Sequence, residues 1–247
     1  MSIILNEKSY VEDLLASRAK ENVTNHNLRL VSRYYHELGC NNTKVRDLLE
    51  KFIIRNDPNF NVVRMSNIID RAAKNIGKKK LVQLDSIPIT YAEIDLVQKL
   101  DSIREQKILF TLICLAKLSN EINGINLGWV NRSVKEIFEL ANMYSMTKEK
   151  QHLLLHSLYK QGFIVFNKRI DNMNIKVSCL NYNSDPCLYI NDYRNLGNQY
   201  LRYLGEPYFE CESCGAVVRK TANNMKYCSD CAKEINRLNA KERKIKS

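Results

Sequence analysis

The sequence predicts a mainly α-helical protein with small β-hairpins and a cysteine module near its C-terminus. Three observations lead to this prediction. Apolar residues recur at helical spacing along most of the 247-residue chain, only 8 Gly and 4 Pro interrupt it, and two Cys-x-x-Cys pairs lie near its end. Because 45% of the residues are apolar, the chain can bury hydrophobic cores, and its composition differs from that of a disordered protein.

An N-terminal helical bundle is expected over residues 1–80, where apolar periodicity marks four amphipathic helices. Gly39 follows the second helix and can supply the left-handed residue that ends it. Asn42 or Thr43 can cap the third helix, since both side chains can accept a hydrogen bond from a free backbone N–H. The bundle is treated as a separate domain.

A second domain is expected over residues 81–180. Thr90 and Glu93 have the spacing of a capping box, which predicts the start of a helix. Apolar periodicity and turn residues then predict helices over 104–118, 133–141 and 147–161, followed by strands over 163–166 and 175–180. The apolar residues assigned to the buried face of the third of these helices are Leu153, Leu154, Leu155 and Leu158.

This order of a helix, a short helix, a turn, a longer helix and a β-hairpin resembles the winged helix-turn-helix fold of DNA-binding proteins. The passage Leu158-x-x-x-Gly162-Phe163-Ile164, from helix into hairpin, is common in that fold. The resemblance covers residues 104–180 and implies that the N-terminal half of the last helix enters a DNA major groove. The nucleic-acid contacts that it implies are Ser145, Thr147, Lys148, Lys150, Gln151 and His152, and at the hairpin tip Lys168, Arg169 and Lys176.

Two other interpretations of these polar residues stay open. They can form an ordinary solvated face, and winged helices also serve as protein-docking modules. Between this domain and the cysteine module, residues 181–209 hold six of the thirteen tyrosines and are interpreted as a connector. Its tyrosines can stack on unpaired bases, but packing between domains or across a dimer interface is preferred.

The most specific pattern in the chain is a pair of Cys-x-x-Cys turns separated by thirteen residues. Zn²⁺ prefers four tetrahedral thiolates, and each turn can bring two sulfurs to the same ion. The spacer, residues 215–227, is long enough to form a hairpin that returns to the site, and a helical pattern follows the second turn. A zinc ion is therefore predicted, bound by Cys211, Cys214, Cys228 and Cys231.

Residues 210–247 resemble treble-clef and zinc-ribbon-like modules. The Gly after the first pair, Lys226-Tyr227 before the second and the Lys/Arg-rich helix resemble the tails of many bacteriophage and mobile-element proteins. A redox-active pair would stand alone near a βαβ pattern, and a catalytic zinc would keep one position open, so both are disfavoured. Whether the closed site only stabilises the module or also places the tail on nucleic acid stays open.

Positive charge favours a polyanionic partner, with nucleic acid first. The chain carries 38 Lys and Arg against 27 Asp and Glu, a formal charge of +11. Four thiolates and a divalent ion would change this to about +9. The C-terminal tail concentrates the cations, although it can also be a solvated end helix, and it adds these candidate nucleic-acid contacts: Arg219, Lys220, Arg237, Lys241, Arg243 and Lys244.

Motifs of common enzymes are absent from the sequence. It has no Walker loop, Rossmann glycine pattern, nucleophile elbow or zincin helix, so the chain is expected not to be an enzyme. It shows no secretion signal and no run of about 18 apolar residues, which predicts a cytoplasmic protein without a membrane partner.

Two hypotheses about function follow. The leading hypothesis is a DNA-binding protein of a phage or mobile element, which binds duplex DNA and acts in transcription control or replication initiation. The alternative is an interaction protein of similar origin that inhibits or redirects a host complex, such as a defence system or RNA polymerase. In that case its basic faces would block or share a nucleic-acid groove.

Overall fold

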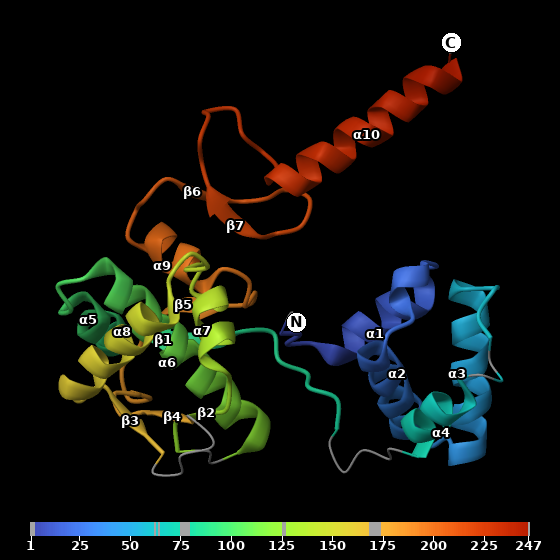
Figure 1. The fold of residues 1–247 in the computed structure, drawn as a ribbon, viewed down its shortest axis with the longest axis horizontal. Helices are drawn as coiled ribbons and strands as arrows, with labels where there is room; N and C mark the ends of the chain where they lie inside the picture. Colours follow the sequence, from blue (N-terminus) through green and yellow to red (C-terminus); the bar gives the residue numbers. More distant parts are fainter. Residues whose placement is uncertain are drawn as a thin grey trace. The chain divides into compact units, whose positions relative to one another are not determined.

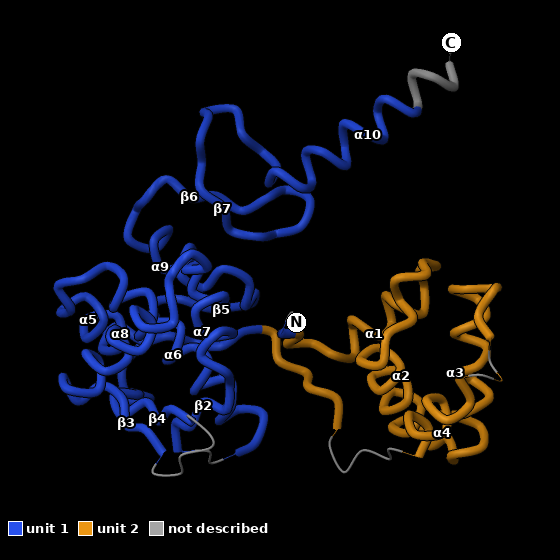
Figure 2. The backbone as a smooth tube through the Cα atoms, viewed as in Figure 1, with its two compact units in different colours: residues 1–3, 86–247 blue, residues 4–85 orange. Residues whose placement is uncertain are grey.

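The computed structural model describes residues 3–61, 63, 65–74, 80–124, 127–167 and 174–246, with side chains as far as Lys241. The chain divides into two compact units, one of residues 4–85 and one of residues 1–3 and 86–247 (Figure 2). It is mainly helical, and its described sheets are antiparallel with two or three strands each. At this level the predicted fold class is confirmed.

The smaller unit is a bundle of helices. Its elements are α1 (Glu7–Ala16), the 3₁₀ helix η1 (Lys20–Asn22), α2 (Asn25–Glu37), α3 (Asn42–Asn56) and α4 (Ser66–Lys74). Gly39 follows α2 with a φ of 83°, as predicted. The cap of α3 lies one residue before the predicted pair, because the side chain of Asn41 accepts the hydrogen bond from the N–H of Lys44.

One apolar core holds the bundle together, and Val11, Leu30, Val45, Leu49 and Ile53 are fully buried in it. Side chains of α2 also cover the last carbonyls of α4. Ser32 Oγ donates a hydrogen bond to the Ala72 carbonyl at 2.8 Å, and His36 Nε2 lies 3.0 Å from the Ala73 carbonyl. These contacts give partners to groups that a helix end otherwise leaves unpaired.

The larger unit is built around α6 (Ile103–Asn123), in which every residue from 108 to 118 is buried. A helix buried on all sides must be enclosed by other elements. The elements that pack against α6 are α5 (Tyr91–Gln98), α7 (Val134–Leu140), α8 (Lys148–Lys160), α9 (Leu196–Tyr203), β1 (Ile87–Thr90), β2 (Trp129–Val130) and β4 (Ile175–Val177). The unit also contains β3 (Ile164–Phe166), β5 (Pro186–Ile190), β6 (Tyr208–Glu210), β7 (Val217–Arg219) and α10 (Ser229–Lys246) (Figure 1). Although α6 is long, neither it nor any other described helix combines the length and apolarity needed to cross a bilayer.

Three antiparallel sheets complete this unit. The largest has the strand order β2-β4-β3, so β4 lies in the middle with Lys176 opposite both Trp129 and Val165. β1 pairs with the distant β5, and β6 pairs with β7. The β2-β4-β3 sheet is formed by the same stretch of chain that contains α6, α7 and α8.

The predicted capping box at the start of α5 is present, and it is buried. The Glu93 carboxylate accepts a hydrogen bond from the N–H of Thr90 at 2.9 Å, and Thr90 Oγ accepts one from the N–H of Glu93. The same carboxylate lies 2.7 Å from Nζ of Lys117 on α6, with both side chains almost fully buried. Because the N–H of Asn181 donates to the other oxygen, both oxygens of this buried carboxylate have hydrogen-bond donors.

Residues 181–209, which were interpreted as a connector, contain β5 and α9 and pack into the core of the larger unit. Tyr193 is buried and its hydroxyl donates a hydrogen bond to the Cys114 carbonyl at 2.9 Å. Tyr200 is also buried, with its ring centroid 5.1 Å from that of Phe110. Neither element has a local signal in the sequence, because their partners, on β1 and α6, lie far away along the chain.

Candidate metal centre and nucleic-acid surfaces

The first Cys-x-x-Cys pair is the turn of the β6–β7 hairpin. The N–H of Cys211 donates to the Ala216 carbonyl at 3.0 Å, and the N–H of Gly215 donates to the Cys211 carbonyl at 2.8 Å. Gly215 has a φ of 73°, which lets the chain reverse directly after Cys214. The expectation of a hairpin within the spacer is therefore wrong in one respect: the spacer supplies only β7, and its partner β6 precedes the first cysteine.

The second pair lies at the N-terminus of α10. Cys228 directly precedes the helix, Cys231 lies in its first turn, and the N–H of Ala232 donates to the Cys228 carbonyl at 2.9 Å. The N–H of Glu212 donates to the Lys226 carbonyl at 3.0 Å, which ties the second turn to the first. Since helix N-termini carry free N–H groups and positive partial charge, this position favours thiolates.

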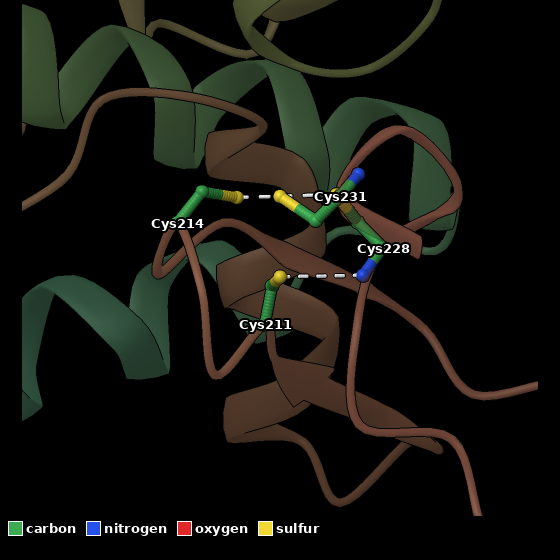
Figure 3. Close-up of side chains that lie close together, drawn as sticks. All are labelled: Cys211, Cys214, Cys228 and Cys231. Atoms are coloured by element: carbon green, nitrogen blue, oxygen red, sulfur yellow. Dashed lines mark hydrogen bonds between the residues drawn. The ribbon is translucent and has the colours of Figure 1, made fainter. Parts of the chain in front are cut away.

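The two turns bring all four sulfur atoms together, as the side chains in Figure 3 show. The sulfurs lie 3.6–3.9 Å from one another. A tetrahedron with metal–sulfur bonds of about 2.3 Å has edges of about 3.8 Å, so the cluster has the dimensions of a four-thiolate metal site. Tetrahedral four-sulfur sites are typical of zinc or iron. Within the described part of the chain, this is the one group of potential metal ligands of this kind.

Backbone donors act on the sulfurs. The N–H of Cys228 lies 3.2 Å from Cys211 Sγ, and the N–H of Cys231 lies 3.5 Å from Cys228 Sγ. Burial raises the pKa of Cys211, but hydrogen bonds from the N–H groups of Cys228, Cys214 and Ser213 lower it to about 6. A hydrogen bond with Ser213 lowers the pKa of Cys231, whereas hydrogen bonds with the neighbouring thiols raise it to about 12. Thiols that share protons in this way repel one another when ionised, and a divalent cation removes that repulsion.

Polar contacts join the hairpin to α9. Asn198 on α9 is buried, and its Nδ2 donates to the Val217 carbonyl at 3.0 Å. Its Oδ1 accepts a hydrogen bond from Asn142, in the turn between α7 and α8, at 2.8 Å. Arg194, paired with Asp192, donates to the Cys214 carbonyl at 2.5 Å. Asn198 was not among the predicted site residues, because no local pattern marks a residue whose two partners are both distant in the sequence.

The predicted nucleic-acid contacts on α8 are mostly exposed. Lys148, Lys150 and His152 are open to solvent at the start of α8, and so are Ser145 and Thr147 in the turn before it. Gln151 is only half-buried, but its Nε2 donates to the Met146 carbonyl at 3.0 Å, so its amide holds the turn before α8. The hairpin contacts differ from expectation, because Lys176 lies within the central strand β4 and not at the tip. Lys168 and Arg169 lie outside the described residues.

The tail contacts are spread over the hairpin and α10. Arg219 ends β7, Lys220 follows it, and both are exposed. On α10, Arg237 is ion-paired with Glu234 at 2.6 Å, while Lys241 is exposed. The side chains of Arg243 and Lys244 lie outside the described part. Figure 1 shows α10 extending away from the hairpin as a single long helix.

An apolar patch lies on the surface of α8 and β3. Leu153, expected to face the core, is 69% exposed, because three consecutive leucines on a helix cannot all point to one side. It borders a cavity of about 700 Å³ that is also lined by His152, His156 and Phe166. Tyr159 is exposed, and its ring lies 5.4 Å from that of Phe166. We call Leu153, Tyr159 and Phe166 the α8–β3 patch.

Comparisons with known proteins identify no family for this site. No protein-family model, no curated protein and no solved structure matches the chain. The interpretation of the cysteine cluster and of α8 therefore depends on their own geometry and chemistry.

Proposed function

We propose that this protein is a non-enzymatic nucleic-acid-binding protein that contacts duplex DNA through α8. One observation carries the proposal: α6, β2, α7, α8, β3 and β4 follow one another in the order of a winged helix-turn-helix domain, and the exposed start of α8 holds Lys148 and Lys150. In such domains the second helix of the motif lies in the major groove and its N-terminal residues contact base edges.

Each of the exposed groups on α8 has a chemical role in this proposal. Lys148 and Lys150 would neutralise phosphates or donate to guanine, and Ser145 and Thr147 would bond to phosphate or base edges. The half-buried Lys176 would contact the backbone from the sheet beside α8. These contacts would act in a phage or mobile-element regulator or replication-initiation factor, the origin that the sequence of the tail supports.

The metal in this proposal is Zn²⁺, held by Cys211, Cys214, Cys228 and Cys231. Four thiolates fill a tetrahedral shell and leave no position for substrate, so the ion has a structural role. It would hold the first turn of α10 against the hairpin, and thereby present Lys241 and the other cations of the tail to phosphates. Contacts of this type are independent of base sequence and weaken strongly with salt.

Charge reversal on α8 tests the proposal. The variant Lys148→Glu/Lys150→Glu is compared with Lys99→Glu/Arg104→Glu, which makes the same charge change at exposed positions near the junction of α5 and α6. Fluorescence anisotropy of a labelled duplex, measured over a range of salt concentrations, should show at least about a 10-fold loss of affinity for the first variant. Equal affinities for the two variants would contradict the proposal.

A second candidate function, docking on a host protein complex, is favoured by the α8–β3 patch. Solvent-exposed apolar clusters mark interaction sites, and Leu153 lies on the face of α8 that would otherwise enter the groove. Glu149 lies on this face as well, and hydrogen bonds from its own backbone and from Thr147 lower its pKa, so it stays anionic and repels phosphate.

A pull-down from host lysate, with and without nuclease, separates the two functions. A protein partner that is retained after nuclease treatment and lost in a Leu153→Asp variant supports docking. Capture of nucleic acid alone, unchanged by Leu153→Asp but lost after charge reversal at Lys148 and Lys150, supports the DNA-binding function.

A further inference from the structure

A groove on the N-terminal bundle, between α2 and α4, is lined by positive charge. It encloses about 420 Å³. Its lining includes Leu28 and Arg29 from α2 and Ile68, Arg71, Ala72 and Lys74 from α4. The three cations are exposed, whereas Leu28 and Ala72 are buried and Ile68 is half-buried. The groove therefore has an apolar floor and a basic rim.

The cations of the rim have no anionic partner in the described part of the chain. Asp70, the acidic neighbour of Arg71 on α4, is turned toward α3, where its carboxylate lies 2.7 Å from Nε of Arg46. Arg29, Arg71 and Lys74 make no ion pair or side-chain hydrogen bond among the described residues. No carboxylate lines the groove within this part of the chain.

Helix electrostatics explain this arrangement only in part. Arg71 and Lys74 lie in the last turn of α4, where cations interact favourably with the helix dipole. The last carbonyls of that helix, however, already have Ser32 and His36 as partners. Arg29, the fifth residue of α2, lies outside the last turn of its helix, so the helix dipole does not account for its position. Three cations that converge without compensation indicate a site for an external anion.

We propose that this groove binds the phosphate backbone of a nucleic acid, as a contact surface separate from α8 and the tail. The inference rests on the proposed nucleic-acid-binding function and extends it to the other compact unit. Two of the three cations are arginines, whose forked N–H donors match the oxygens of a phosphate. Sugar C–H groups would lie on the apolar floor between the two helices. An acidic protein segment would also match the charges of the rim. A nucleic acid is preferred because its phosphates can also contact the excess of positive charge elsewhere in the chain.

The experiment compares two triple variants of the full chain with equal net charge. Arg29→Gln/Arg71→Gln/Lys74→Gln removes the rim, and Lys8→Gln/Lys44→Gln/Lys51→Gln removes exposed lysines of α1 and α3 outside the groove. Binding of a labelled duplex of about 20 base pairs is measured by anisotropy against salt concentration. If each rim cation contacts one phosphate, the rim variant should lose about 10- to 100-fold in affinity at about 0.15 M salt, with a shallower salt slope. Circular dichroism and thermal unfolding should be the same for both variants, since all six positions are exposed.

The possible outcomes separate this inference from the proposed role of α8. If the wild-type chain binds the duplex and the two triple variants bind equally well, the groove inference is overturned while the α8 contact can stand. If the rim variant loses affinity but charge reversal at Lys148 and Lys150 changes nothing, the groove inference is supported and the α8 contact is wrong. Labelled polyglutamate serves as a second probe in the same assay. A wild-type chain that binds polyglutamate and not the duplex, or binds neither of the two, overturns the groove inference.

Discussion

The N-terminal bundle and the cysteine hairpin differ in how much apolar surface they bury. Among the described residues of the bundle, thirteen buried apolar residues from α1–α4 and Leu81 form its core. In residues 208–241, only Cys211, Ala216 and Val217 are buried. So small a module cannot bury enough apolar surface to fold by itself, and metal–sulfur bonds are the expected substitute. We therefore expect the stabilities of the two parts to be separable, so that each can be lost while the other is kept.

Loss of the metal should have the largest effect. The variant Cys228→Ser removes one thiolate, and the energy of a structural zinc site, about 10 kcal/mol or more, is then largely lost from the hairpin. Elemental analysis should fall from about one metal ion per chain to near zero, and limited proteolysis should cut within residues 207–232. The matched variant Cys40→Ser, in the bundle and outside the cluster, should keep its metal. Parallel loss of the bundle in Cys228→Ser would show that the two stabilities are not separable.

A cavity in the core of the bundle should destabilise the bundle and leave the metal site unchanged. Leu49 is fully buried, so Leu49→Ala removes packing that its neighbours on α1–α4 cannot replace, at a cost of about 2–5 kcal/mol. Denaturant unfolding followed by amide NMR signals of the bundle measures this loss. Leu38→Ala, at a position that is 62% exposed, provides the control. Metal content should stay unchanged in both variants, and metal loss in Leu49→Ala would break the comparison.

A smaller effect is expected where the hairpin joins α9. Asn198→Ala removes the buried donor to the Val217 carbonyl and the acceptor for Asn142, which should cost the larger unit about 1–3 kcal/mol. Metal should also leave more rapidly when a chelator is added, because the hairpin loses an anchor. Asn191→Ala, at an exposed position of the same segment, should behave as the wild type. Identical rates of metal release for both variants would show that the hairpin is held by its metal alone.

The smallest effect is expected on the stability of the larger unit at low pH, where a carboxyl group titrates in addition to the thiols. At the start of α7, hydrogen bonds from the backbone N–H and the hydroxyl of Ser133 lower the pKa of Glu136. A carboxyl group with a lowered pKa stabilises the folded state above its usual pKa of about 4.3, and this contribution is lost as the pH falls through the lowered value. Below about pH 5, the free energy of unfolding should therefore fall less with pH in Glu136→Gln than in the wild type. The difference should be less than about 1 kcal/mol, since the group is largely exposed. A profile that is unchanged between wild type and variant would contradict this.

Local signals in the sequence predicted the local parts of the fold. Gly39 ends a helix and Thr90 with Glu93 forms a capping box because the partners lie within a few residues of each other. The cysteine cluster was also predictable, since two short turns set most of its geometry. Whether a motif is buried or exposed was not predictable. Nothing near Glu93 indicates that its carboxylate meets Lys117 in the core, whereas the similar box at Ser133 and Glu136 is exposed.

Features that depend on distant residues were missed or misassigned. β5 and α9 have their partners on β1 and α6, so the tyrosine-rich segment showed no pattern of its own. The hairpin was placed after the first cysteine pair because β6 becomes a strand only through its pairing with β7. The exposure of Leu153 follows from helical geometry, since the two leucines after it already occupy the buried side.

The length of α10 has a consequence for how far the metal site can act. Its 18 residues span about 27 Å, and its first turn contains Cys231 of the candidate metal cluster. A duplex lying along this helix would be covered for about eight base pairs, measured from the ion. The metal would then fix the position of the first turn of α10, and the length of α10 would set the distance between the contacts at the two ends of the helix. Inserting or deleting one helical turn in α10 should shift the far contact by about 5.4 Å without changing the near one.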